Sequence, residues 1–236
     1  MVRLFRDTPE SVLALYAHPD DADVAAGGAL AQWARNGARV DLVIVCDGAK
    51  GSDDASVDVG ELRARRAEEL ADAARLLGIH SVACLGVPDG EVTNSSEFRS
   101  QLVGLIRSQR PTIVVGPDPT AVFFDGVYVN HRDHRELGWA LLDAVAPAAA
   151  MPLYFPEHGP AHQVSTILLS GTHEPDVVVD ITASIDDKVA AVQAHRSQVS
   201  GDADWVSSAI RGRAEPVGRD VNVRFGEAFR CVELAR

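Results

Sequence analysis

Short apolar runs alternate along the chain with longer segments of helical pattern, and this alternation constrains the fold most strongly. Runs typical of buried strands lie at 12–17, 40–46, 81–85 and 112–116. Segments with helical patterning follow them, at 24–36, 61–77, 97–110 and 135–145. Because parallel strands need a crossover connection, which is usually a helix, the pattern predicts an α/β fold with a mostly parallel sheet. We expect a Rossmann-like, three-layer arrangement.

Composition narrows the classes of protein that fit this pattern. The 236 residues suffice for one large α/β domain with a sizeable core. The formal net charge of -12 argues against binding to duplex nucleic acid or to anionic membranes, because both need basic patches. No apolar stretch reaches the length of a membrane span, and charges stand where a signal peptide needs an apolar core, so we expect a cytoplasmic protein without membrane insertion.

A compact polar cluster, His18-Pro19-Asp20-Asp21, directly follows the first buried run. Pro19 fixes its own backbone and disfavours helical geometry at His18, so the turn is stiff. Ligands bind in open parallel sheets at the carboxyl ends of the strands, which is where this cluster lies. Taken alone, the stretch is equally typical of a turn in which an aspartate caps the next helix.

A second polar cluster, Asn130-His131-Arg132-Asp133-His134, opens a helical pattern downstream of another predicted strand. Residues three apart on a helix share one face, so His131 and His134 can point into one pocket. Alone, this cluster also fits a solvated helix start with Asp133 favoured by the helix dipole. If both clusters lie at the same edge of the sheet, they bring two sets of histidine and aspartate together.

Such a combination can bind a metal and perform hydrolysis. Two histidines and one carboxylate hold zinc while leaving a fourth position open. The metal lowers the pKa of water to about 7 and polarises a carbonyl group. A further carboxylate can act as general base, and a further histidine can stabilise an oxyanion. The cysteines, only three and widely spaced, form no C-x-x-C pair that would indicate a cysteine zinc site.

The last third of the chain is less regular. Pro152, Pro156 and Pro160 mark a loop-rich stretch. Beyond it the patterns predict strands at 164–169 and 176–181, a helix at 184–198 and a short strand that includes 229–234. No linker separates this part, so we expect a single domain over 1–236. It would have a Rossmann-like core at 1–146 and a C-terminal extension at 147–236 that covers the site.

Together the motifs resemble the LmbE-like, or N-acetylglucosaminyl-phosphatidylinositol deacetylase-like (PIG-L), family of zinc-dependent hydrolases. The resemblance covers most of the chain. The paired histidine–aspartate clusters are its specific part. Its weaker elements are Gly27-Gly28, Asp47-Gly48-Ala49-Lys50-Gly51, Arg66-Ala67-Glu68-Glu69-Leu70, Leu77-Gly78-Ile79, Pro88-Asp89-Gly90, and Lys188 through His195-Arg196-Ser197-Gln198.

The resemblance implies one bound metal ion and a catalytic base. His18, Asp21 and His134 would bind Zn2+, and Asp20 would deprotonate the attacking water. Iron(II), Fe2+, stays open as an alternative because histidine and aspartate ligands suit both metals.

The resemblance also implies roles around the metal. His131 would polarise the amide and stabilise the oxyanion, with Asp133 orienting it. Arg66 and Asp89 would contact polar groups of the substrate, and Tyr128 is a further candidate for such a contact.

The chain departs from the family pattern at two points. The family usually has Glu directly after the two aspartates, whereas here Ala22 stands there, followed by Asp23. Some members that act on glucosaminyl-inositol compounds have a tyrosine two residues before the first distal histidine. Here that residue is Val129, with Tyr128 one position earlier.

The expected function is hydrolysis of an acetyl or other acyl amide on an amino sugar or a related small molecule. One alternative is an amidase of larger N-acyl groups or thiol conjugates. Another is a metal-dependent phosphoesterase, against which the ligand set for a single metal counts. An alternative of a different class is a non-catalytic α/β module that binds a sugar or a nucleotide. The sequence leaves a homo-oligomer open.

Overall fold

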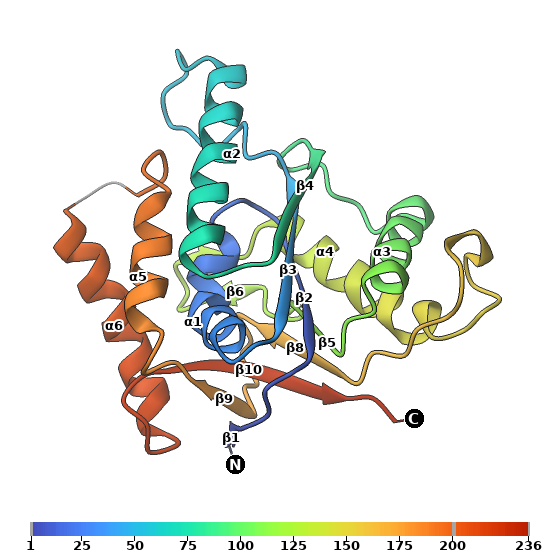
Figure 1. Cartoon of the computed structure of the whole chain (residues 1–236). Helices are drawn as coiled ribbons and strands as arrows, with labels where there is room; N and C mark the ends of the chain where they lie inside the picture. Colours follow the sequence, from blue (N-terminus) through green and yellow to red (C-terminus); the bar gives the residue numbers. More distant parts are fainter. Residues whose placement is uncertain (1, 200–201, 236) are drawn as a thin grey trace.

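The computed structural model describes residues 2–199 and 202–235. Its centre is an eight-stranded sheet in the order β1-β9-β10-β8-β5-β2-β3-β4 (Figure 1). Five neighbouring strands run parallel: β2 (Ser11–Tyr16), β3 (Arg39–Cys46), β4 (Ser81–Val87), β5 (Ile113–Pro117) and β8 (Thr166–Ser170). At the other end β1 (Arg3–Phe5) lies parallel to β9 (Val177–Asp180). Between the two groups β10 (Gly226–Glu233) is antiparallel to both β8 and β9.

Helices cover both faces of this sheet, as Figure 1 shows. One face carries α1 (Asp21–Arg35), α2 (Val59–Leu76), α5 (Ile185–Ala194) and α6 (Ala203–Arg219). The other carries α3 (Ser96–Gln109) and α4 (Arg132–Asp143). Three short elements lie between them: a hairpin of β6 (Phe123–Phe124) and β7 (Tyr128–Val129), a kinked stretch at Ala144–Ala149 and a 3-10 turn at Pro156–His158. The predicted three-layer α/β fold with a mostly parallel sheet is confirmed.

Each face of the sheet has its own apolar core. Trp33, Leu42 and Phe229 belong to the core beneath α1, α5 and α6. Leu15 and Leu102 belong to the core beneath α3 and α4. Because β2 is covered on both faces, its apolar residues run without the polar alternation of a half-exposed strand.

The C-terminal part of the chain differs from its predicted outline. It contributes β8, β9 and β10 to the same sheet, and its 17-residue helix α6 is absent from the prediction. Gly212 and Pro216 interrupt the helical pattern of α6, and both residues disfavour a helix interior. That β10 joins β8 to β9 supports the single domain, which stays a prediction.

Among the described residues, no helix combines the length and the apolar character that a membrane span needs. The expected cytoplasmic location stays a prediction.

The strand order explains where a site can form. From β2 the chain proceeds outward through β3 and β4, whereas β5 and β8 lie on the other side of β2. A crevice opens where the direction of winding reverses, at the carboxyl ends of β2 and β5. The turn after β2 contains His18, and the chain after β5 continues through the hairpin into α4, which carries His134.

Candidate active site

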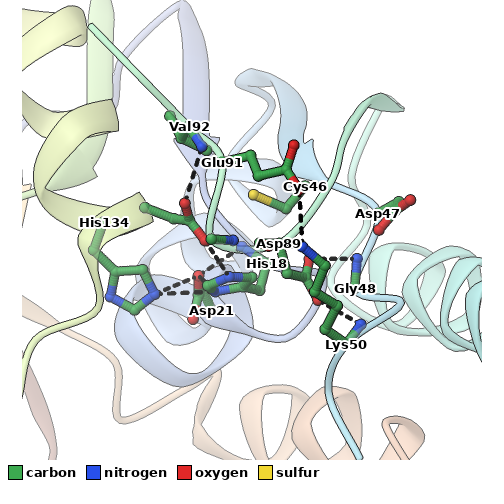
Figure 2. A network of polar contacts seen from close by, with 12 residues as sticks. His18, Asp21, Cys46, Asp47, Gly48, Lys50, Asp89, Glu91, Val92 and His134 are labelled. Carbon is green, nitrogen blue, oxygen red and sulfur yellow. Dashed lines mark hydrogen bonds and ion pairs between the residues drawn. The ribbon is translucent and has the colours of Figure 1, made fainter.

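Three donor atoms from the two polar clusters converge at this crevice. His18 lies in the turn between β2 and α1, and its amide donates a hydrogen bond to Oδ2 of Asp21, the first residue of α1 (2.7 Å). His134, in the first turn of α4, has Nε2 at 3.2 Å from His18 Nδ1. Asp21 Oδ2 lies 3.0 Å from His134 Nε2 and 3.3 Å from His18 Nδ1. Figure 2 shows the three side chains directed toward one another.

The spacing of these atoms fits a single metal ion. Ligands bound tetrahedrally to zinc at about 2.0–2.1 Å lie roughly 3.3 Å from one another. Two nitrogens and one carboxylate oxygen also form a donor set that zinc accepts while a further position stays open. His131 borders the same point, because its ring nitrogen lies within 4.8 Å of those of His18 and His134. The predicted ligand set is therefore sterically consistent and stays a prediction.

The electrostatics of the cluster favour a cation. Burial alone would lower the pKa of His18, but Asp21, followed by Cys46, raises this pKa to about 11 through hydrogen bonding and charge. Burial alone would raise the pKa of Asp21, but His134 and His18 together hold it well below its usual range. The carboxylate thus stays ionised and attracts a positive charge, whether a ring proton or a metal ion.

A second set of hydrogen bonds orients the histidines. His18 Nε2 lies 3.1 Å from Asp133 Oδ2, and His134 Nδ1 lies 2.8 Å from Asn130 Oδ1. Asp133 also accepts hydrogen bonds from the amides of Gly90 (2.6 Å) and Val92 (3.1 Å). Such contacts fix the ring orientation of a metal-binding histidine.

Asp133 has a contact that the sequence did not predict. It is buried, and its carboxylate lies beside His18. Its predicted role, to orient His131, stays a prediction.

Asp20 lies beside the donor cluster without joining it. Its Oδ1 accepts a hydrogen bond from Arg66 Nη2 (2.8 Å), and Arg66 Nη1 donates to the Gly48 carbonyl (3.0 Å). The side chain of Arg66 is 3% exposed, whereas that of Asp20 is 30% exposed. Arg66 therefore holds Asp20 from behind while one side of the Asp20 carboxylate faces a cavity.

His131 and Tyr128 form the exposed side of the cluster. The ring centroid of His131 lies 5.6 Å from that of His18 and 5.2 Å from that of His134. Burial, followed by the nearby charges of His134 and His18, lowers the pKa of His131. The ring of Tyr128 is tilted against that of His131 at a centroid distance of 5.6 Å, so Tyr128 reaches the site despite its shifted position in the sequence.

Two cavities meet at this cluster, and both include Asp21, Tyr128 and His134 in their walls. The first, of about 470 Å3, is called the polar cavity. Its other wall residues are His18, Asp20, Lys50, Gly51, Arg66, Asp89, Gly90, His131, Arg132, Asp133 and Gln198. The second, of about 780 Å3, is called the large cavity and extends along the ends of β2, β5 and β8.

Asp89 faces the polar cavity but is already engaged. Its two carboxylate oxygens accept hydrogen bonds from the amides of Gly48 and Lys50, each at 2.9 Å. Lys50 Nζ donates in turn to the Asp89 carbonyl (2.7 Å) and to Glu91 (3.0 Å). Figure 2 shows this network beside the cluster, so Asp89 orders the loop after β3 as well as lining the cavity.

Sequence reasoning did not assign Lys50, Gln198 or Asn130 to the site. Gln198 lies near the C-terminal motif that the resemblance had already noted, and its Nε2 donates to the Gly51 carbonyl (3.0 Å). Asn130 directly precedes the distal histidines, which is a signal that points to a supporting contact. No sequence pattern predicted the contact between Lys50 Nζ and Glu91 beside the polar cavity.

The departure at position 22 has a structural counterpart. Ala22 is fully buried, and a Glu there would enter the core. Asp23, one residue later, is buried too and lies 2.8 Å from Nε2 of the buried His195 in α5's C-terminal cap. A buried carboxylate is thus still present next to the site, but it belongs to residue 23 and not to residue 22.

Known proteins share both the sequence and the fold of this chain. A diacetylchitobiose deacetylase of Thermococcus kodakarensis is 31% identical, with 94% of this chain and 83% of the relative covered. A 1D-myo-inositol 2-acetamido-2-deoxy-alpha-D-glucopyranoside deacetylase of Saccharopolyspora erythraea is also 31% identical, with 84% and 87% covered. The structure of the N,N'-diacetylchitobiose deacetylase from Pyrococcus horikoshii superposes with a TM-score of 0.86 at 33% identity, covering 95% of this chain and 84% of that one.

The family model for PIG-L, the GlcNAc-PI de-N-acetylases, matches residues 13–145. This stretch contains both polar clusters, most of β2 and all of α4. The expected enzyme class, a hydrolase of amide bonds, is confirmed by these relationships. By sequence and by fold, the chain belongs to the PIG-L family.

Proposed function

We propose that the protein is a metal-dependent amide hydrolase that removes an acetyl or other acyl group from an amino sugar or a related small molecule. The observation that carries this proposal is the division between neighbouring carboxylates: Asp21 joins the cluster with His18 and His134, whereas Asp20 stays outside it and faces the polar cavity. The relatives that are named deacetylases of N-acetylated sugars support the substrate class.

A zinc ion held by His18, Asp21 and His134 would polarise the amide carbonyl and make water more acidic at neutral pH. Iron(II) would fit the same donors. We favour zinc, because amide hydrolysis needs a Lewis acid and no redox change.

The protein's own groups then supply the proton transfers. Asp20 accepts a proton from water as the water oxygen bonds to the carbonyl carbon. His131 donates a hydrogen bond to the carbonyl oxygen as it gains negative charge. The proton from Asp20, or one from His131, passes to the amide nitrogen as the C–N bond breaks, which yields a free amine and a carboxylic acid that loses its proton to solvent. Arg66 keeps Asp20 in position throughout.

The polar cavity is suited to the amine side of the substrate. Asp89 lines it, and each of its carboxylate oxygens keeps a lone pair for a sugar hydroxyl beside the backbone amide bond that it already accepts. A small molecule of this kind as partner agrees with the acidic character of the chain, which disfavours nucleic acid.

The test is release of free amine from N-acetylglucosamine derivatives, with metal content measured on the same sample. Asp20→Asn should retain the metal yet lower kcat by about 100- to 10,000-fold, the usual contribution of a general base. Glu91→Gln, at the exposed rim, serves as the matched control and should keep full turnover. Near-normal turnover in Asp20→Asn would exclude Asp20 as the base.

A further inference from the structure

The large cavity is not explained by binding of a sugar in the polar cavity. It starts at the same cluster, because Asp21 and His134 form part of its wall, and it extends away from the polar cavity over Val24 and Ala25 of α1. The hairpin residues Phe124 and Val127 line it as well. It is the larger of the two cavities at the cluster, at about 780 Å3 against about 470 Å3.

The two cavities differ in chemistry. Charged side chains from several loops line the polar cavity, among them Lys50, Arg66 and Asp89. The large cavity has mostly apolar walls, and its charged residues other than Asp21, namely Asp125 and Arg213, are exposed to solvent.

The polar groups at the floor of the large cavity are already paired. Tyr16 is buried, and its hydroxyl is hydrogen-bonded to the Ser170 hydroxyl at 2.9 Å. The Ser170 hydroxyl also donates to the Gly116 carbonyl (3.3 Å). An apolar group can therefore lie against this floor without leaving the hydroxyls of Tyr16 and Ser170 unpaired.

An amide has an amine side and an acyl side, and each side can lie in one of the two cavities. With the carbonyl at the cluster, the amine side carries the hydroxyl groups and suits the polar cavity. The acyl side is the apolar part and is left facing the large cavity. The methyl group of an acetyl needs no more room than one water molecule, about 30 Å3. Most of the large cavity would stay unused by an N-acetyl substrate.

We infer that the large cavity is an acyl-chain subsite, and that the enzyme prefers amides of medium-length fatty acyl groups to acetyl amides. This inference rests on the proposed function and specifies the acyl part of its substrate. Each methylene that enters the cavity removes apolar surface from water, so kcat/KM should rise by about twofold to fourfold per carbon until the chain reaches the exposed rim.

The experiment compares glucosamine N-acylated with acetyl, butyryl, hexanoyl and octanoyl groups on the metal-loaded wild type. We expect kcat/KM for the hexanoyl amide to exceed that for the acetyl amide by at least tenfold. A decline with every added carbon would overturn the inference.

A variant that fills the cavity makes the assignment specific to this surface. Val24→Trp places a bulky side chain in the wall from a half-exposed position on α1. It should lower kcat/KM for the hexanoyl amide at least tenfold and leave that for the acetyl amide within about threefold. Leu76→Trp, an equally bulky change on the exposed surface of α2, should alter neither. Ala25→Leu is the second cavity-filling variant, for use if Val24→Trp does not fold.

The outcomes separate the acyl chain from other occupants. If Val24→Trp impairs hydrolysis of diacetylchitobiose but not of the hexanoyl amide, the cavity holds a second sugar and the inference is wrong. If wild type cleaves acetyl amides with no effect of chain length, the inference fails while the proposed function stands. If the metal-loaded protein cleaves no amide in the series, both fail.

Discussion

Asp20 and Asp21 are neighbours in the sequence, yet their carboxylates have different partners. Asp21 is the first residue of α1 and faces His18 and His134, whereas Asp20 precedes the helix and faces Arg66. Successive residues near a helix start point about 100° apart, so a single turn can present one carboxylate to the cluster and the other to the cavity. The stiff His18-Pro19 step helps to fix the directions of the Asp20 and Asp21 side chains.

Asp133 offers a test of the contact that holds His18. Asp133→Asn removes the negative charge opposite His18 Nε2, so the histidine should become a weaker and less ordered ligand. We expect affinity for zinc to fall by about 10- to 100-fold, as is usual for loss of such a supporting carboxylate. Competition with a chromogenic chelator measures this affinity.

The matched control for this test is Asp89→Asn, a carboxylate that also accepts two backbone amide bonds but touches no histidine. Unchanged zinc affinity in Asp133→Asn would show that His18 needs no such partner. An equal loss in both variants would assign the effect to loop order.

The metal-binding candidates could be predicted at this scale, whereas their supports could not. The spacing of His18 and Asp21, and of His131 and His134, places side chains on one side of a turn. That Asp133 would reach across to His18, 115 residues away, depends on how α4 docks against β2. No local pattern contains that information.

At the scale of elements, a buried pair joins α1 to the end of α5. Asp23 and His195 are both almost fully buried, and His195 Nε2 is the partner of Asp23 Oδ2 at 2.8 Å. Burial raises the pKa of Asp23, which shows how poorly this environment solvates a charge. The pair fixes the first turn of α1, and with it Asp20 and Asp21.

His195→Ala should therefore weaken the fold through α1. Leaving the buried Asp23 carboxyl without its partner costs about 1–3 kcal/mol. For a chain of this size that corresponds to a fall in Tm of roughly 2–12 °C. Thermal unfolding of His195→Ala, Asp23→Asn and the double variant measures the coupling. If the two single effects simply add, the pair contributes nothing as a pair.

A second carboxylate, Asp118, ties the end of β5 to the segment after β8. It accepts hydrogen bonds from the hydroxyls of Thr120 and Thr172, each at 2.6 Å. Burial alone would raise the pKa of Asp118, but the hydrogen bonds from Thr120 and Thr172 hold it below its usual value of 3.8. A depressed carboxyl pKa stabilises the fold above pH 3.8, and this contribution disappears as pH falls through the folded-state pKa.

Asp118→Asn should thus lower the free energy of unfolding by about 1–3 kcal/mol at neutral pH. The difference from wild type should stay constant down to about pH 5 and shrink below about pH 4. Urea unfolding of both proteins across this range tests the prediction. A difference that grows on acidification would contradict the sign.

The elements themselves were predictable to different degrees. Strands such as β2 can be predicted from the sequence, because burial on both faces requires an unbroken apolar run. The helix α6 was missed because Gly212 and Pro216 lower its intrinsic propensity, while packing of Val206 and Ile210 against the sheet stabilises it. The antiparallel position of β10 depends on pairing with two strands distant in sequence, and no pattern in residues 226–233 encodes it.

At the scale of the whole molecule, the cluster connects segments that the strand order keeps apart. His18 and Asp21 follow β2, whereas His134 lies on α4, which comes after β3, β4 and β5 in the sequence. A metal bound by all three would bridge the turn before α1 on one face of the sheet and α4 on the other. In an unfolded chain these donors are far apart, so the metal binds the folded state much more tightly.

Removal of the metal should therefore lower the stability of the whole molecule. A ligand at about 1,000 times its Kd stabilises the state that binds it by about 4 kcal/mol, which corresponds to roughly 8–16 °C in Tm for a chain of this length. Calorimetry before and after treatment with a chelator, and again after adding zinc, measures this shift. His134→Ala should fold without the shift, because it lacks one donor of the cluster. Equal Tm values for the chelated and zinc-loaded wild type would show that the three donors do not hold a metal together.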